Sequence, residues 1–141
     1  MDACGEIERP SIQDGGHLIG DNEPPVPYSS TPGTSGWHSS GAPPTGIHSA
    51  PLTDPQIVSV LHVGGVVAVY DADRIGDDQL AELEQLARDD ERLTVAPYEG
   101  GLPTPLSLLG WGYLQRCDAV DVDTISDFVE LTAGAADGHT G

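Results

Sequence analysis

Apolar and polar residues follow no regular period up to about residue 56. From there on, their spacing predicts secondary structure. Residues 1–23 are charged and aperiodic, and residues 24–55 are repeatedly interrupted by proline, which disfavours helix interiors and central strands alike. We therefore expect a mobile N-terminal tail over 1–23 and a C-terminal tail over 135–141. A single domain over 24–134 would include the Gly- and Ser-rich loop 31–52.

Four stretches have the pattern of β-strands. Residues 57–63 alternate apolar and polar, and residues 65–70 form a continuous apolar run typical of a strand buried on both faces. A short strand follows over 92–98. Residues 102–117 are also β-like and contain two glycines around Trp111, which indicate a β-bulge.

Two stretches have the pattern of amphipathic helices. In residues 71–93, the apolar side chains recur at helical spacing, and in residues 121–134 they do so again. The order β-β-α-β-β-α predicts an α+β fold, in which two helices cover one face of a small mixed or antiparallel sheet. A thioredoxin-like fold beginning at Val66 is the alternative. The apolar faces are Leu80, Leu83, Leu86 and Ala87 in the first helix, and Ile125, Phe128, Val129 and Thr132 in the second.

The composition narrows the classes of partner. The chain of 141 residues has a formal charge of −18, from 23 acidic residues against five arginines and no lysine. Such a chain repels nucleic acid and anionic membrane surfaces. The absence of lysine excludes Schiff-base catalysis. No motif for a nucleotide cofactor is present.

The N-terminal sequence, the two cysteines and the lengths of the apolar stretches bear on the expected location of the protein. Cys4 and Cys117 are far apart, so neither a disulfide nor a Cys-based zinc site is expected. The acidic N-terminus does not have the form of a signal peptide. No stretch approaches the ~20 apolar residues that span a bilayer. These observations predict a soluble, cytoplasmic protein.

Several short motifs occur in a familiar order. TSGWH, GIHSAPL, LHVGGVVAVY, APYEGGLPTP and LLGWG follow one another and precede the second helix. In this order they resemble the bacterial family called domain of unknown function 3105, over about residues 24–134. The resemblance implies that loop 31–52 is ordered and packs against the strand that carries His62. Members of the family look like membrane-tethered, extracytoplasmic domains with a His- and Glu-based metal site, but the resemblance implies no particular activity.

The chain departs from the family pattern at the histidines. The pattern runs Pro-Thr-Ser-Gly-Pro-His, Gly-x-Tyr and His-x-Leu-Glu-His-Gly-Gly-Val-Val. Aligned on Gly-Gly-Val, the first His of the long motif falls on Ser59, its Glu on His62 and its second His on Val63. The His after Thr-Ser-Gly is retained as His38, whereas the Tyr of Gly-x-Tyr becomes His48. A changed set of histidines implies a reassigned site.

His38, His48 and His62 are therefore the candidate catalytic residues. Imidazole can act as general acid or base near neutral pH, and three imidazoles can bind a single Zn or Cu ion. Surface or hydrogen-bonded histidines of no special role are the alternative for each. His17 and His139 lie in the predicted tails and are expected to be inert. The residues expected to line a substrate pocket are Trp37, Ser59, Tyr70 and Trp111.

These observations favour a small soluble enzyme that acts on an organic small molecule. Cyclases, isomerases and lyases need mainly shape, exclusion of water and one or two acid–base groups, which a loop-covered histidine site would supply. A His-based metal-binding protein or metalloenzyme is the second hypothesis. A non-catalytic binding module is the third.

Overall fold

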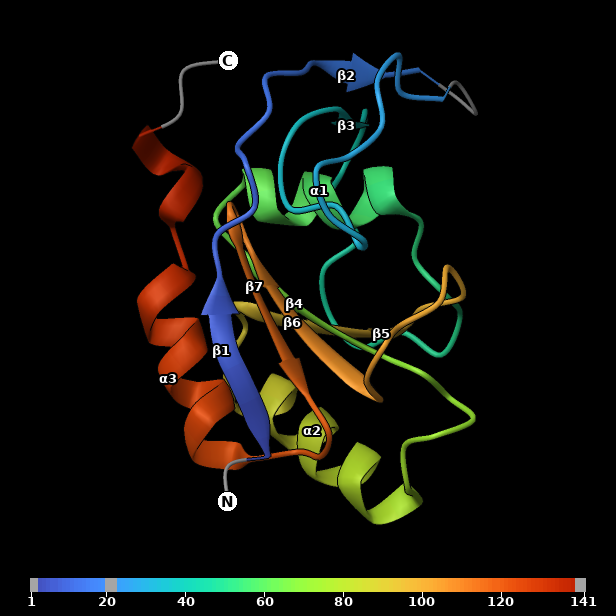
Figure 1. The fold of residues 1–141 in the computed structure, drawn as a ribbon, viewed down its shortest axis with the longest axis vertical. Helices are drawn as coiled ribbons and strands as arrows, with labels where there is room; N and C mark the ends of the chain where they lie inside the picture. Colours follow the sequence, from blue (N-terminus) through green and yellow to red (C-terminus); the bar gives the residue numbers. More distant parts are fainter. Residues whose placement is uncertain (1–2, 20–22, 139–141) are drawn as a thin grey trace.

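Eleven helical and strand segments make up the computed structural model, which describes residues 3–19 and 23–138. The predicted α+β class is confirmed (Figure 1). The strands are β1 (Cys4–Glu8), β2 (His17–Leu18), β3 (His38–Ser39), β4 (Val66–Tyr70), β5 (Leu93–Pro97), β6 (Leu106–Gly110) and β7 (Tyr113–Cys117). The helices are α1 (Asp54–His62), α2 (Asp77–Asp89), α3 (Val122–Thr132) and the 3-10 helix η1 (Ala135–Gly138).

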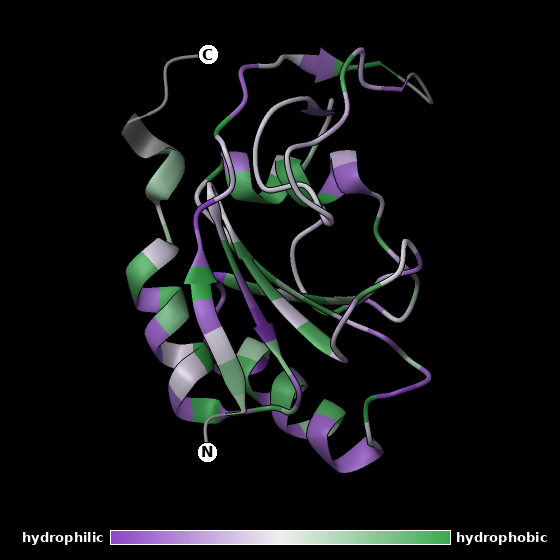
Figure 2. Cartoon of the chain, viewed as in Figure 1, coloured by the Kyte–Doolittle hydropathy of each residue, from purple (hydrophilic) through white to green (hydrophobic). Residues whose placement is uncertain are grey.

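A mixed five-stranded sheet lies at the centre of the molecule, with strand order β1-β7-β6-β4-β5. Only β4 and β5 run parallel, and the other neighbours are antiparallel. The mixed sheet is as predicted, and the thioredoxin-like alternative is not confirmed. The central strands are hydrophobic along much of their length (Figure 2), as expected for strands covered on both faces.

Helices cover both faces of the sheet, so the prediction of helices on one face only is incomplete. Side chains of α2 and α3 pack on the face formed by Val66, Ala68 and Tyr70 of β4. The opposite face, which includes Val67 and Val69, packs against α1. Because successive side chains of a strand point to opposite faces, β4 contributes to both apolar cores.

The stretch predicted as a strand over 57–63 is instead helix α1. Its start has a capping box, in which the Thr53 side chain accepts a hydrogen bond from the backbone of Gln56 and the Gln56 side chain accepts one from the backbone of Thr53. Pro55 lies in the first turn, where proline is compatible with a helix. All residues from Ile57 to Leu61 are buried. The sheet covers one side of α1, and the segment between β1 and α1, described over residues 9–19 and 23–53, covers the other. We call this segment the N-terminal arm. A helix buried on all sides has no polar stripe to reveal its period.

The predicted β-bulge at Trp111 is a hairpin turn. Strand β6 ends at Gly110 and β7 begins at Tyr113, so Trp111 and Gly112 form a two-residue connection. Gly112 has φ +77°, a conformation that favours glycine. The turn presents the Trp111 side chain to the α1 side of the sheet, where it is buried.

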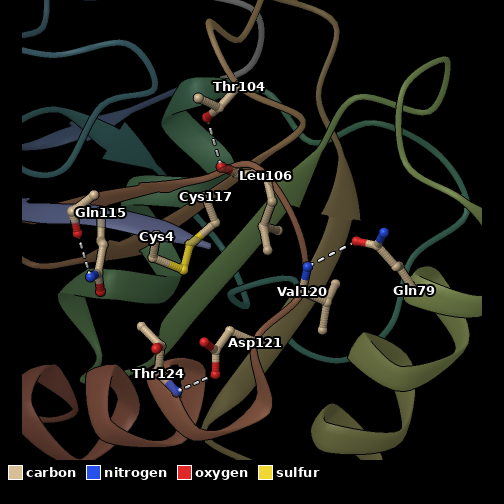
Figure 3. Close-up of a disulfide and its surroundings, with 10 residues drawn as sticks. Cys4, Gln79, Thr104, Leu106, Gln115, Cys117, Val120, Asp121 and Thr124 are labelled. Atoms are coloured by element: carbon tan, nitrogen blue, oxygen red, sulfur yellow. Dashed lines mark hydrogen bonds between the residues drawn. A yellow bond between two sulfur atoms is a disulfide. The ribbon is translucent and has the colours of Figure 1, made fainter. Parts of the chain in front are cut away.

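The N-terminal segment is part of the fold, which contradicts the predicted mobile tail. Strand β1 pairs with β7 at the edge of the sheet, and β2 pairs with β3. Cys4 lies opposite Cys117 and forms a disulfide with it, contrary to our prediction of no disulfide (Figure 3). The Gln115 side chain also donates a hydrogen bond to the carbonyl of Gly5, at 2.8 Å.

At the other end, Ala136 in η1 is buried against the α1 side of the sheet, so the predicted C-terminal tail is in part packed. His139 lies outside the described residues. Within residues 3–19 and 23–138, no helix is both long and apolar enough to cross a membrane.

Candidate functional site

Strand β3 and the end of α1 bring two of the predicted histidines together. His38 is 4% exposed, and His62 is the last residue of α1. Their rings stack with centroids 4.3 Å apart and an angle of 21° between their planes. The N-terminal arm therefore folds back onto α1, as the resemblance implied, although His62 stands on a helix rather than on a strand.

Two further rings extend this stack into a row. His17 in β2 lies opposite His38 in the β2–β3 ladder, and their ring centroids are 4.5 Å apart. On the other side, the Trp111 ring meets His62 edge-on, with centroids 5.6 Å apart. We call these four side chains, His17, His38, His62 and Trp111, the ring row. It runs from the exposed His17 through the buried His38 to the buried Trp111.

The hydrogen bond of His38 assigns its tautomer. Its Nδ1 lies 2.9 Å from the carbonyl oxygen of Gly36, and a carbonyl can only accept, so Nδ1 carries the proton. The neutral ring then has a bare lone pair on Nε2. This atom is buried and has no hydrogen-bond partner among the described residues. An acceptor left unpaired in this way costs about 1–3 kcal/mol, and such exceptions call for an explanation.

His48 is not part of the ring row. The segment around it pairs with the free edge of β5, where the His48 backbone N–H donates to the carbonyl of Val95. Its ring Nε2 lies 2.7 Å from the carbonyl oxygen of Pro44. The structure thus brings together only two of the three histidines predicted as catalytic, and it adds His17, which sequence reasoning set aside as inert.

The four residues predicted to line the pocket are divided between the two faces of the sheet. Trp111 touches His62, as described above. Ser59 is buried in α1, and its Oγ donates to the carbonyl of Gln56 at 2.6 Å. Trp37 is half-buried against Gly16. Tyr70 belongs to the core between the sheet and helices α2 and α3, so it cannot line a site beside His62.

The predicted metal site does not form in the described part of the chain. Among these residues, no three His, Cys, Asp or Glu side chains are grouped so that they could hold an ion. The stacking of His38 on His62 gives a physical reason. Ligating lone pairs lie in the ring planes, and the planes of these stacked rings are inclined by only 21°, so their lone pairs lie in nearly parallel planes rather than meeting at one ion.

A cleft of about 650 Å³ lies on the arm side of α1. Ser39 contributes to its wall, and so does the first turn of α1, including Asp54. We call it the arm cleft. The side chains that line it are Leu18, Glu23, Pro24, Pro25, Val26, Pro27, Tyr28, Ser39, Thr53, Asp54 and Pro55.

Asp54 lies near two tyrosines, of which Tyr28 lines the cleft and Tyr98 lies outside it. The Tyr98 hydroxyl donates to Asp54 Oδ1 at 2.8 Å, and the Tyr28 hydroxyl donates to the carbonyl of Trp37 at 2.7 Å. Burial and, secondarily, the negative charge of Asp54 raise the pKa of both tyrosines well above the ordinary range. Both hydroxyls therefore stay protonated and able to donate at neutral pH.

Sequence reasoning missed His17, Tyr28 and Asp54. Asp54 had a local signal, because it lies inside the capping box that begins α1. No local signal marks Tyr28 or His17, since each acquires its role only when the arm packs on α1.

The described geometry thus defines an α+β domain with a row of aromatic and imidazole rings beside a proline-lined cleft. The sequence profile of a family described as protein of unknown function (DUF3105) matches residues 21–140. The chain belongs to this family. Comparisons with curated proteins and with solved structures gave no match.

Proposed function

We propose that the protein is a small enzyme that catalyses proton transfer on an organic small molecule, with His38 and His62 as its acid–base pair. Reactions of the cyclase, isomerase and lyase type need one group that removes a proton and one that returns it. Two imidazoles in different surroundings can divide these roles. His48 has no part in this proposal.

The unpartnered Nε2 of His38 is the observation that carries the proposal. The Gly36 carbonyl keeps the proton of the neutral ring on Nδ1, so Nε2 is left as a lone pair. This atom is therefore a base shielded from water. His62 is only half-buried, so it is the ring that exchanges protons with solvent or with a bound molecule.

The other rings of the row hold this pair in place. His17 packs edge-on against His38 on the solvent side, and Trp111 packs edge-on against His62 on the core side.

A base-catalysed probe reaction tests this proposal without a known substrate. In the ring opening of nitrobenzisoxazole, a base removes the carbon-bound proton, and the electrons of that C–H bond form the carbon–nitrogen triple bond of a nitrile. The N–O bond breaks in the same step, and its electrons pass to the phenolate oxygen. We expect the protein to exceed the rate of an equal concentration of free imidazole by at least about tenfold. His38→Gln and His62→Gln should each abolish this excess.

His48→Gln is the matched control, because it removes a half-buried imidazole outside the ring row. It should keep the full rate. Equal rates for the protein and free imidazole, or equal losses in all three variants, would contradict the proposal.

The metal-binding alternative is not favoured by the described geometry, because the paired lone pairs do not converge. A non-catalytic binding module remains the alternative if the probe reaction is not accelerated.

The proposal also includes the cellular compartment in which the protein works. The prediction of a cytoplasmic location is untested, whereas the Cys4–Cys117 disulfide favours an oxidising environment. We infer that the protein works where this disulfide persists.

A further inference from the structure

We propose that the arm cleft binds a small organic cation, an amine or quaternary ammonium group on an apolar body, with Asp54 as its counter-ion. The inference does not depend on the acid–base role of the ring row. It rests on the shape of the cleft, the chemistry of its wall and the distribution of charge around it.

The size and the wall of the cleft suit an organic molecule rather than a metal ion. Its volume of about 650 Å³ lies within the ~300–1,000 Å³ of typical small-molecule sites. Prolines 24, 25, 27 and 55 supply much of the apolar wall. Proline rings have little conformational freedom to lose on binding, so this wall is organised in advance.

The aromatic ring of Tyr28 contributes to the same wall. It is fixed at its far end, because its hydroxyl donates to the carbonyl of Trp37, and Gly33 lies so close to the ring that a Cβ there would approach Cδ1 to 2.8 Å. A fixed tyrosine face attracts a cationic group that sits over it.

The charged side chains that line the cleft are all acidic. Glu23 and Asp54 line the cleft, and none of the lining residues is Lys, Arg or His. The Tyr98 hydroxyl orients Asp54 by donating a hydrogen bond to its Oδ1. The backbone nitrogen of Gly33 lies 3.5 Å from the same Oδ1 atom. Burial and, secondarily, the charge of Asp54 raise the pKa of the Tyr28 and Tyr98 hydroxyls.

Within the described residues, which include all five arginines, none pairs with this carboxylate. Their contacts are with other groups: Arg74 pairs with Asp71, Arg92 with Asp90 and Glu130, Arg116 with Glu8, Arg88 donates to Gln85, and Arg9 lies over the Tyr113 ring. With a net charge of −18 on the whole chain, the surrounding field also favours a cationic ligand.

The first turn of α1 does not reverse this preference. A helix N-terminus attracts anions through its unpaired N–H groups. Here the Gln56 N–H is occupied by the Thr53 side chain, and Pro55 has no N–H to offer. The negative charge of Asp54 stands in the same turn, so an anionic ligand would meet repulsion rather than free donors.

Isothermal titration calorimetry with three matched probes tests the inference. Phenethylammonium, phenethyl alcohol and phenylacetate share a benzene ring and differ in charge. We expect the ammonium probe to bind best, the alcohol at least about tenfold more weakly and the carboxylate not measurably. The affinity for the ammonium probe should fall as salt is raised, because salt screens the pairing with Asp54.

Two pairs of variants locate the binding. Asp54→Asn should weaken the ammonium probe by at least about tenfold, whereas Asp77→Asn, which removes an exposed aspartate from the first turn of α2, should not. Ser39→Trp should fill the cleft and abolish binding. Ser40→Trp places the same ring at the exposed neighbouring residue and should leave binding intact.

The ligand class is wrong if the alcohol binds as tightly as the ammonium probe, if phenylacetate binds better, or if none of the probes binds. The location is wrong if Asp54→Asn and Asp77→Asn have equal effects. These readouts measure ligand affinity alone, so they can fail while the probe reaction at the ring row succeeds, or the reverse.

Discussion

His38 obtains its properties from residues distant in the sequence. Strand β2 packs His17 against one side of its ring, and α1 packs His62 against another. Only the contact with the Gly36 carbonyl is local. Three separate segments thus hold the His38 ring so that its Nε2 is buried and has no hydrogen-bond partner among the described residues.

The Tyr98 hydroxyl makes the stability of the fold dependent on pH in the alkaline range. Burial, and then the charge and hydrogen bond of Asp54, raise the pKa of Tyr98 above its ordinary value of 10.0. The folded state therefore holds this proton more tightly than the unfolded chain does. Its contribution to stability is complete below about pH 10 and is lost as the pH rises above it. We expect the free energy of unfolding, measured in urea, to fall by up to about 1.4 kcal/mol per pH unit for this group.

Tyr98→Phe separates this group from other alkaline effects. The variant should be less stable at pH 8 by about 1 kcal/mol, because the hydrogen bond to Asp54 is lost. Above pH 10 its stability should decline less steeply than that of the wild type. Parallel declines would show that Tyr98 has the same pKa in the folded and unfolded states.

The residue types of the site could be read from the sequence, but their assembly could not. A folded-back arm predicts that His38, His48 and His62 lie together, whereas the structure brings only His38 and His62 into contact. Tyr70 is predicted to line the same pocket, but side chains alternate between the two faces along β4, and that of Tyr70 lies on the opposite face of the sheet. His48 looked equivalent to His38, but its backbone pairs with the β5 edge. Such choices depend on strand register, which no local pattern encodes.

Helix α1 is the element on which both candidate sites depend. Its last residue carries the His62 ring, and its first turn carries Asp54. Movement or fraying of this helix would therefore disturb the ring row and the arm cleft together.

The capping box provides a test at this scale. Thr53→Ala should lower the free energy of unfolding by about 1 kcal/mol, because the Gln56 backbone loses its side-chain acceptor. Thr45→Ala in the exposed part of the arm is the control, and chemical denaturation measures both. Equal small effects would mean that the cap contributes nothing to α1.

The type of α1 was the clearest error of prediction. Val58, Val60 and Ile57 are β-branched and favour strands, and their alternation with Ser59 has the period of a strand. The signal in favour of a helix lay just upstream, in the Thr53 to Gln56 capping box. By contrast, α2 and α3 were predicted correctly, because solvent on one side gives each a polar face (Figure 2).

At the scale of the whole molecule, the disulfide joins the first strand of the sheet, β1, to the last, β7. It links Cys4 to Cys117 across 113 residues and fixes β1 to the edge of the sheet (Figure 3). Closing so long a loop stabilises the fold by removing conformational entropy from the unfolded chain. Sequence separation alone makes this pairing look improbable, since the contact between β1 and β7 is set by the topology of the sheet.

Removing the disulfide should therefore destabilise the protein. Cys4→Ser combined with Cys117→Ser should lower the free energy of unfolding by about 2–5 kcal/mol, and reduction of the wild type should have a comparable effect. Thiol titration of the unfolded, unreduced protein should find no free thiol. Two free thiols in protein purified without oxidant would contradict the disulfide and the oxidising compartment inferred from it.

The most direct test of the central claim is the protonation state of the His38 ring. Nitrogen NMR of histidine-labelled protein at about pH 8 distinguishes a protonated ring nitrogen from a bare one. The account predicts a proton on Nδ1 and a bare Nε2 without a hydrogen bond, at a resonance that His38→Gln removes. A proton on Nε2, or an even mixture of both tautomers as in free histidine in water, would contradict it.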